Sequence, residues 1–183
     1  MSAYTIKLLD ASTWDAFERL AEKHSGMGFG GCWCTWFHSR VGRPEGEKGR
    51  SWKERLVREG DAHAALVLDG DAAVAWCQYG SPDELPNIHH RKEYEATNTD
   101  EPPDYRITCI FVDRDYRRKG VAGVALGGAL DLIAKAGGGV VEGYPRIYRR
   151  ARRFRPRFST TSRAASTSRP ASATTGPRAR TIA

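Results

Sequence analysis

The last 39 residues of this 183-residue chain differ in composition from everything before them. Residues 145–183 contain eleven Arg and no Lys, Asp, Glu, Leu or Val. A segment without periodic apolar residues cannot bury a core, and this composition is typical of disordered chain. We therefore expect the folded domain to occupy residues 1–144, and residues 145–183 to form a separate tail that lacks regular structure.

The net charge of +7 comes from this tail. Without its eleven Arg, residues 1–144 hold 18 basic and 22 acidic residues. Clustered Arg residues attract phosphates, so one alternative is a non-catalytic protein that binds nucleic acid or another polyanion through the tail. Because the charge is confined to the tail, it is weak support for a nucleic-acid partner of the folded domain.

The N-terminal region carries no targeting signal that we can identify. Residues 1–10 lack the apolar core of a signal peptide, and no stretch approaches the roughly 20 apolar residues that cross a bilayer. We expect a cytoplasmic protein without a membrane partner. In that compartment its irregularly spaced cysteines are expected to be reduced thiols without a disulfide. They are Cys32, Cys34, Cys77 and Cys109.

Hydrophobic periodicity predicts a single α/β (α+β) domain. A helix joins the strands expected at 105–113 and 140–144, so these two strands should run parallel. The helix carries a face of small and apolar residues that should pack on the sheet, namely Ala122, Leu126, Ala129, Ile133 and Ala136. The other expected elements are a strand at 3–9, helices at 12–25 and 51–60, a hairpin at 63–80 and a long loop at 81–104.

The segment "CIFVDRDYRRKGVAGVALGGALDLI", residues 109–133, predicts an anion site. A strand ends at Val112, and a short charged loop leads directly into a helix. Free backbone N–H groups and the positive end of the helix converge there. Gly120 and Ala122 lack bulk, so a phosphate can approach the main chain closely.

This segment resembles the acetyl-CoA-binding motif of the GNAT superfamily of N-acetyltransferases. The motif R/Q-x-x-G-x-G/A is matched by Arg117, Gly120 and Ala122. The resemblance extends from about Tyr4 to Tyr144. The stretches "GGCWCTWFH" and "AWCQYGSPDELP" also look like ones found in an uncharacterised bacterial branch of the superfamily.

The resemblance implies an enzyme that transfers an acetyl group from acetyl-CoA to the amine of a small molecule or peptide. The two parallel strands would splay apart to admit acetyl-CoA. The backbone of Ile110, Phe111 and Val112 would pair with the pantetheine arm. The pyrophosphate would be held by the amides of Arg118, Lys119, Gly120, Val121 and Ala122. A non-enzymatic acyl-CoA sensor is a further alternative.

Two carboxylates are candidates for the base that accepts the amine proton. Glu84 lies in the loop after the hairpin, and Glu142 lies on the last strand beside the expected thioester. The alternation of residues along 140–144 does not determine which face of the sheet Glu142 takes. The sequence identifies neither the acceptor substrate nor the oligomeric state.

We expect no metal site. Cys32, Cys34 and His38 supply only three groups, and the paired C-x-x-C spacing of zinc sites is missing. The two cysteines and their aromatic neighbours Trp33, Trp36 and Phe37 are expected to pack under the sheet or to line an acceptor pocket.

After its fifth strand a GNAT domain needs another helix and two more strands, which residues 145–183 cannot supply as written. Moving the reading register back by one base allows residues 158–163 to spell F-L-Y-N-V-T and residues 164–172 to spell R-S-L-Y-E-P-A-G-F. Residues 174–180 then allow Y-D-R-P-K-G-K. These strings resemble the missing cofactor-contacting Asn and the Tyr-bearing helix of the family. We therefore interpret the tail as the product of a one-base frameshift, real or a sequencing error, close to codon 145. The nucleotide sequence of the gene tests this.

Overall fold

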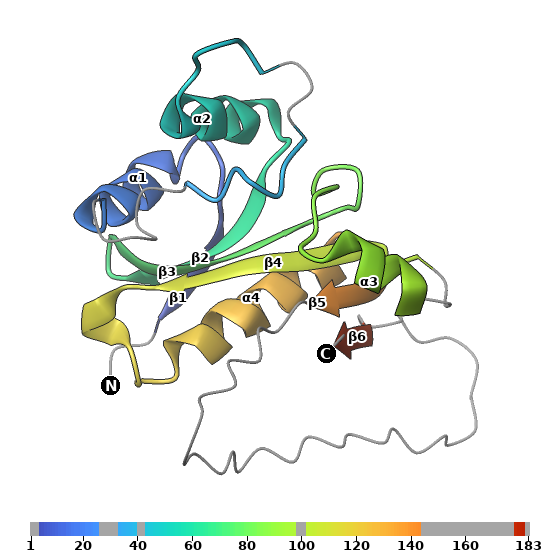
Figure 1. Cartoon of the computed structure of the whole chain (residues 1–183). Helices are drawn as coiled ribbons and strands as arrows, with labels where there is room; N and C mark the ends of the chain where they lie inside the picture. Colours follow the sequence, from blue (N-terminus) through green and yellow to red (C-terminus); the bar gives the residue numbers. More distant parts are fainter. Residues whose placement is uncertain (1–3, 26–32, 40–42, 98–101, 144–177, 182–183) are drawn as a thin grey trace, which may run out of the picture.

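The structure, a computed structural model, describes residues 4–25, 33–39, 43–97, 102–143 and 178–181. Its strands form one mixed sheet in the order β1-β2-β3-β4-β5-β6, with helices on both faces (Figure 1). This architecture confirms the predicted α/β fold class. The strands are β1 (Thr5–Leu8), β2 (His63–Asp69), β3 (Ala72–Gly80), β4 (Tyr105–Val112), β5 (Val140–Gly143) and β6 (Arg178–Thr181). The helices are α1 (Trp14–Lys23), α2 (Gly49–Glu59), α3 (Arg91–Thr97), the 3-10 helix η1 (Arg114–Tyr116) and α4 (Val121–Lys135).

The first four strands form an antiparallel sheet, and the chain then crosses over through α4. β4 and β5 consequently pair in parallel, as predicted, from Tyr105 opposite Val141 to Ile107 opposite Gly143. β6 pairs in parallel with β5. It lies in the tail, where the sequence predicted no element. Residues 144–177 and 182–183, which make up most of that tail, lie outside the described part of the chain.

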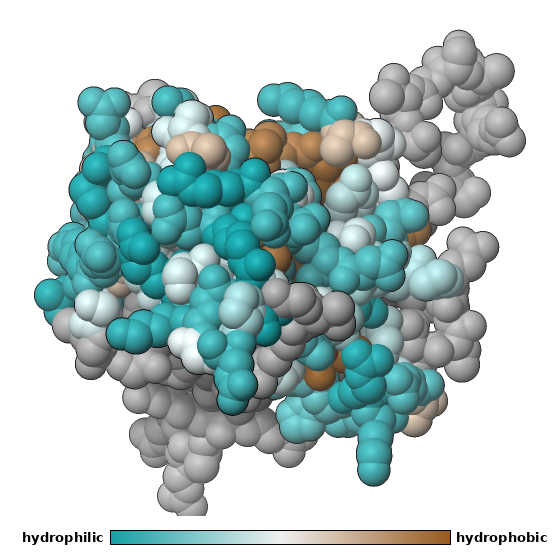
Figure 2. Space-filling model, turned by 90° about the horizontal axis from the view of Figure 1, so that it is seen from above, coloured by the Kyte–Doolittle hydropathy of each residue, from teal (hydrophilic) through white to brown (hydrophobic). Residues whose placement is uncertain are grey.

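The sheet separates two apolar cores. On one side, called here the α1/α2 face, helices α1 and α2 pack over side chains such as Leu66 and Trp76. On the opposite side, the α4 face, α4 packs over side chains such as Val67 and Cys77. Figure 2 looks onto α1 and α2 from outside and shows a surface that is mostly hydrophilic. The two layers bury β3 almost completely, whereas β4 is only partly buried.

The buried stripe of α4 differs from the predicted one. Its buried residues begin at Val121 and recur through Ala125 and Ala129 to Ile133, whereas Leu126 is 37% exposed. The helix is apolar around most of its circumference, so periodicity alone did not identify the contact face. The face of α4 that packs on the sheet is the one whose small residues allow a close approach to β1. An added Cβ at Gly128 would lie 2.7 Å from Cγ2 of Ile6 on β1.

The starts of the two N-terminal helices also differ in detail from the prediction. Thr13 precedes α1, but its hydroxyl donates to the carbonyl of Leu8 instead of capping the helix. α2 begins at Gly49, two residues before the predicted Ser51, with Lys48 as the preceding residue. Within the described ranges no helix is long and apolar enough to cross a membrane.

The tight contact of α4 with β1 predicts opposite effects of Ala at two neighbouring glycines. Gly128→Ala should lower the free energy of unfolding by about 1 kcal/mol or more, because the added methyl group forces Ile6 to move. Gly127→Ala meets no atom within 4 Å, so better helix propensity should raise the same quantity by about 0.5–1 kcal/mol. Denaturant unfolding of both variants measures this. Equal effects at the two positions would contradict the packing described here.

Candidate functional site

The loop between β4 and α4 presents its main chain outward. Arg118 and Gly120 both take left-handed backbone conformations, with φ of 62° and 79°. α4 begins directly afterwards, at Val121. Within the described part of the chain, no acceptor receives a hydrogen bond from the backbone N–H groups of residues 118–122. Consecutive unsatisfied amides at the positive end of a helix attract an anion.

The start of this loop is fixed to the end of α1 by Asp113. This carboxylate is buried, and its Oδ1 accepts a hydrogen bond from the backbone N–H of Asp115 at 3.0 Å. Its Oδ2 lies 2.7 Å from Nζ of Lys23, and its Oδ1 lies 3.3 Å from Nε2 of His24. Burial alone would raise the pKa of Asp113, but the hydrogen bonds from Lys23 and Asp115 outweigh burial and lower it.

The three adjacent cations at residues 117–119 of the loop have different surroundings. Nε of Arg117 donates to the carbonyl oxygen of Val112 at 3.3 Å, so this side chain folds back on β4. Nζ of Lys119 lies 4.9 Å from the centre of the Tyr116 ring. The side chain of Arg118 contacts no partner among the residues that the structure describes.

The second half of β4 has one free edge within the described residues. β5 pairs with β4 only as far as Ile107. Residues 109–112 pair with β3 alone, and Ile110 is 41% exposed. The predicted pantetheine-contacting residues therefore lie on an edge that can accept another extended chain. The predicted splaying of β4 and β5 would continue past Gly143, which is outside the described residues.

A chain of polar side chains crosses the α1/α2 face. Nζ of Lys53 on α2 lies 3.0 Å from Nε2 of His38 and donates to Oε1 of Gln78 at 3.2 Å. Nε2 of Gln78 donates to Oγ1 of Thr108 on β4 at 3.2 Å. Lys53, His38 and Gln78 are each about 1% exposed. Burial and then the charge of Lys53 lower the pKa of His38 to about 2, so its imidazole is neutral and Nε2 accepts from Lys53.

Sequence reasoning did not find this chain of contacts. One available signal was the position of Lys53, which lies three residues before Leu56 and four before Val57 on the apolar face of α2. A Lys on a helix face that is otherwise buried usually requires polar partners. His38 was weighed only as a metal ligand. The described residues contain no metal-binding group of His, Cys, Asp or Glu, and Cys34 packs in the core on the α1/α2 face.

The structure determines the orientation of Glu142, which the sequence left open. Val141 points into the core on the α4 face, so Glu142 lies on the α1/α2 face and is 1% exposed. Its Oε2 lies 3.6 Å from Nε of Arg106, directly opposite on β4, and accepts a hydrogen bond from the hydroxyl of Tyr94 at 3.2 Å. Glu142 therefore connects β5, β4 and α3.

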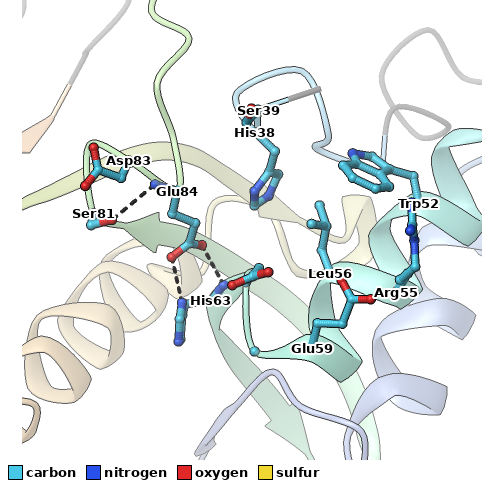
Figure 3. A pocket seen from close by; sticks show the side chains of 12 residues that line it. His38, Ser39, Trp52, Arg55, Leu56, Glu59, His63, Ser81, Asp83 and Glu84 are labelled. Atoms are coloured by element: carbon cyan, nitrogen blue, oxygen red, sulfur yellow. Dashed lines mark hydrogen bonds and ion pairs between the residues drawn. The ribbon is translucent and has the colours of Figure 1, made fainter. Parts of the chain in front are cut away.

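The other candidate base, Glu84, lies in a different set of contacts. Oε1 accepts from the backbone N–H of His63 at 3.0 Å, and Oε2 lies 2.7 Å from Nδ1 of the same residue (Figure 3). The hydrogen bond to Glu84 raises the pKa of His63, although burial opposes it. Both residues line a pocket of about 580 Å³ beside α2. Its other lining residues include His38, Trp52, Leu56 and Glu59.

The predicted site residues thus fall into separate groups. Residues 110–112 and 117–122 form one continuous strand, loop and helix start. Glu142 lies where β5 pairs with β4, and Glu84 lies in the loop after β3, where it contacts the start of β2. Among the described residues, the hydrogen bonds and ion pairs given above connect the two carboxylates to different side chains.

The pairing of Glu84 with His63 predicts a pH-dependent contribution to stability. The raised pKa of His63 means that the pair stabilises the fold below the ordinary His pKa of about 6.5, and that this effect is lost as the pH rises through the raised pKa. Glu84→Gln keeps an acceptor for the backbone of His63 but removes the charge. Thermal unfolding should show a larger loss of Tm for this variant at about pH 6 than at about pH 9. The same loss at both pH values would contradict the pairing.

Solved structures were compared with the whole fold. A ribosomal-protein-alanine N-acetyltransferase from Brucella melitensis biovar Abortus 2308 is 15% identical, with a TM-score of 0.42 over 73% of each chain. The aminoglycoside N-acetyltransferase AAC(6')-Iy in complex with CoA is 12% identical, with a TM-score of 0.47 over 75% of this chain and 73% of that one. A GCN5-related N-acetyltransferase from Ralstonia eutropha JMP134 is 14% identical, with a TM-score of 0.42 over 77% and 82%.

The sequence was also compared with curated proteins and with family models. No curated protein matches it. The model of the acetyltransferase (GNAT) family matches residues 31–147, which is more than half of the chain. The match includes β4, α4 and the loop at 113–120 between them, called here the amide-rich loop. The chain therefore belongs to the acetyltransferase (GNAT) family.

Proposed function

We propose that the chain is an N-acetyltransferase that uses acetyl-CoA to acetylate the amine of a small molecule or peptide. The observation that carries this proposal is the run of free backbone amides at residues 118–122, at the start of α4. Family membership supports acyl transfer in general. The choice of acetyl-CoA as the acyl donor is the further step proposed here.

In this proposal the pyrophosphate of acetyl-CoA binds the amides at the start of α4. Gly120 has no Cβ, and no atom lies within 4 Å of the position that a Cβ would take, so an anion can reach the main chain. Arg118 contributes a positive charge at the same place. From there the pantetheine arm would follow the free edge of β4, where its amides can pair with the backbone of residues 110–112.

The reaction requires a neutral amine and an electrophilic thioester carbonyl. The nitrogen attacks the carbonyl carbon, the C–S bond breaks, and the proton that nitrogen loses is balanced by the proton that the CoA thiolate gains. We propose that Glu142 accepts the amine proton, because it lies on the α1/α2 face where β5 ends its described pairing with β4. Glu84 instead contacts His63 at the start of β2, which β3 separates from β4.

The altered tail is expected to reduce the rate of acetyl transfer more than the affinity for acetyl-CoA. The family match ends at residue 147, close to the codon at which we propose the change of reading frame. The resemblance places a Tyr acid beyond that point, and the chain as written lacks it. We therefore expect this protein to bind acetyl-CoA and to show weak or no acetyl transfer.

A pair of glycine variants tests the proposal. Gly120→Val should raise the Kd for CoA at least about tenfold, a loss of about 1.4 kcal/mol, because a β-branched residue at φ 79° distorts the loop and crowds the amides. Gly70→Val is the matched control. It has a φ of 60°, lies in the turn between β2 and β3, and also meets no atom within 4 Å. It should lose similar stability and keep its affinity for CoA.

Isothermal titration calorimetry with CoA measures both affinities, and release of free thiol from acetyl-CoA in the presence of amines measures turnover. Failure of the unaltered protein to bind CoA, or equal affinity of the two variants, would overturn the proposed site. Binding without any thiol release, even after the reading frame is restored, would indicate an acyl-CoA binder instead of an enzyme.

A further inference from the structure

The polar chain on the α1/α2 face has a fixed hydrogen-bond direction. A Lys ammonium group can only donate, so the oxygen of the Gln78 amide must face Lys53 and its NH₂ group must face Thr108. This settles the amide orientation, which geometry alone often leaves open. The neutral Nε2 of His38 accepts a second hydrogen bond from the same ammonium group.

The direction of the chain leaves the proton of the Thr108 hydroxyl available. Oγ1 of Thr108 accepts from Nε2 of Gln78, so its own O–H must point to a different acceptor. None of the residues that the structure describes accepts that hydrogen bond. Each donor in such a chain polarises the next, and a buried cation at its start strengthens the last donor. Thr108 is therefore a polarised donor on a partly exposed part of β4, where its hydroxyl can donate to a ligand.

Thr108 also occupies an unusual place in β4. Gln78 is paired with Cys109 and Tyr79 with Ile107, so Thr108 is an extra residue in the strand, a β-bulge. A bulge redirects a side chain, and Thr108 reaches the α1/α2 face, where Cys109 also packs. It is also the first residue of β4 beyond the pairing with β5.

The proposed path of acetyl-CoA leads to this residue. From the amide-rich loop the pantetheine arm would run back along β4, and Thr108 lies four residues before Val112, roughly 13 Å along the strand. The thiol is at the far end of that arm. Its thioester would therefore lie near the bulge, at the end of the free edge of β4.

We propose that the hydroxyl of Thr108 donates a hydrogen bond to the carbonyl oxygen of the bound thioester and stabilises the oxyanion that forms on it. This inference rests on the proposed function. When the amine nitrogen forms its bond to the carbonyl carbon, the π electrons move to the carbonyl oxygen, which gains negative charge. When the C–S bond breaks, those electrons return, and CoA leaves as a thiolate that is then protonated. Thr108 keeps its proton throughout, and Gln78 and Lys53 are positioning residues behind it.

Three variants at Thr108 and Gln78 test the proposal. Thr108→Val has nearly the same shape but no hydroxyl, and it should lower kcat by about 10²–10³-fold with little change in the KM for acetyl-CoA. Thr108→Ser retains the donor and should stay close to the unaltered protein. Gln78→Glu tests the direction of the hydrogen bonds, because an ionised carboxylate beside Lys53 can only accept. The Thr108 hydroxyl would then donate to the carboxylate at position 78 instead of to the thioester, so this variant should behave like Thr108→Val.

A spectroscopic measurement makes the test independent of turnover. The carbonyl stretch of acetyl-CoA labelled with ¹³C at the carbonyl carbon should fall in frequency when it binds the unaltered protein and Thr108→Ser. The shift should be smaller for Thr108→Val and Gln78→Glu, because the polarised donor is lost or redirected. Thr5→Val, on exposed β1, is the control for replacing Thr by Val in a strand, and it should change neither the frequency nor the turnover.

The outcomes separate this inference from the proposed function. If the unaltered protein does not bind acetyl-CoA, the proposed function fails. If it binds, and Thr108→Val shows the same carbonyl frequency and the same rate of acetyl transfer, the role of Thr108 is overturned while the binding site stands. Equal loss in Thr108→Val and Thr108→Ser would indicate a packing effect and would also overturn it. Rescue by Ser together with loss in Gln78→Glu supports it.

Discussion

The pairing of β4 with β3 is the constraint on which the rest of the structure depends. β4 pairs with β3 along most of its length, and the one interruption is the bulge at Thr108. This antiparallel pairing holds β4 in place while its other edge is free beyond Ile107 in the described chain. A central strand with a fixed edge and a free edge can receive an extended ligand without unfolding the sheet, because its own hydrogen bonds on the fixed side are already satisfied.

Much of the fold could be predicted from local patterns. The parallel pair β4 and β5, the β2–β3 hairpin and the short loop from β4 into α4 all follow from short stretches whose turn residues and apolar runs act locally. The packed face of α4 could not be predicted, because that helix is apolar around most of its surface and its contact with β1 selects Gly128. The strand β6 was also missed, since four residues such as Arg178–Thr181 carry no apolar alternation.

The candidate site also contains features that local sequence could predict and features that it could not. The amides that precede α4 were predictable because main-chain geometry follows from one Gly and a helix start. The polar residues of the α1/α2 face were not predictable, because Lys53, Gln78 and Thr108 come from three elements. They form hydrogen bonds only where α2, β3 and β4 pack together. Glu84 and Glu142 were found as residue types, but their partners, His63 and Arg106, depend on strand register.

The carboxylate of Asp113 has a further consequence for the order of folding. Its contact with Lys23 joins residues that are 90 positions apart in the sequence. Closing so long a loop costs entropy, which is offset only after the intervening strands have assembled. The amide-rich loop therefore reaches its final shape late, when the end of α1 docks beside it.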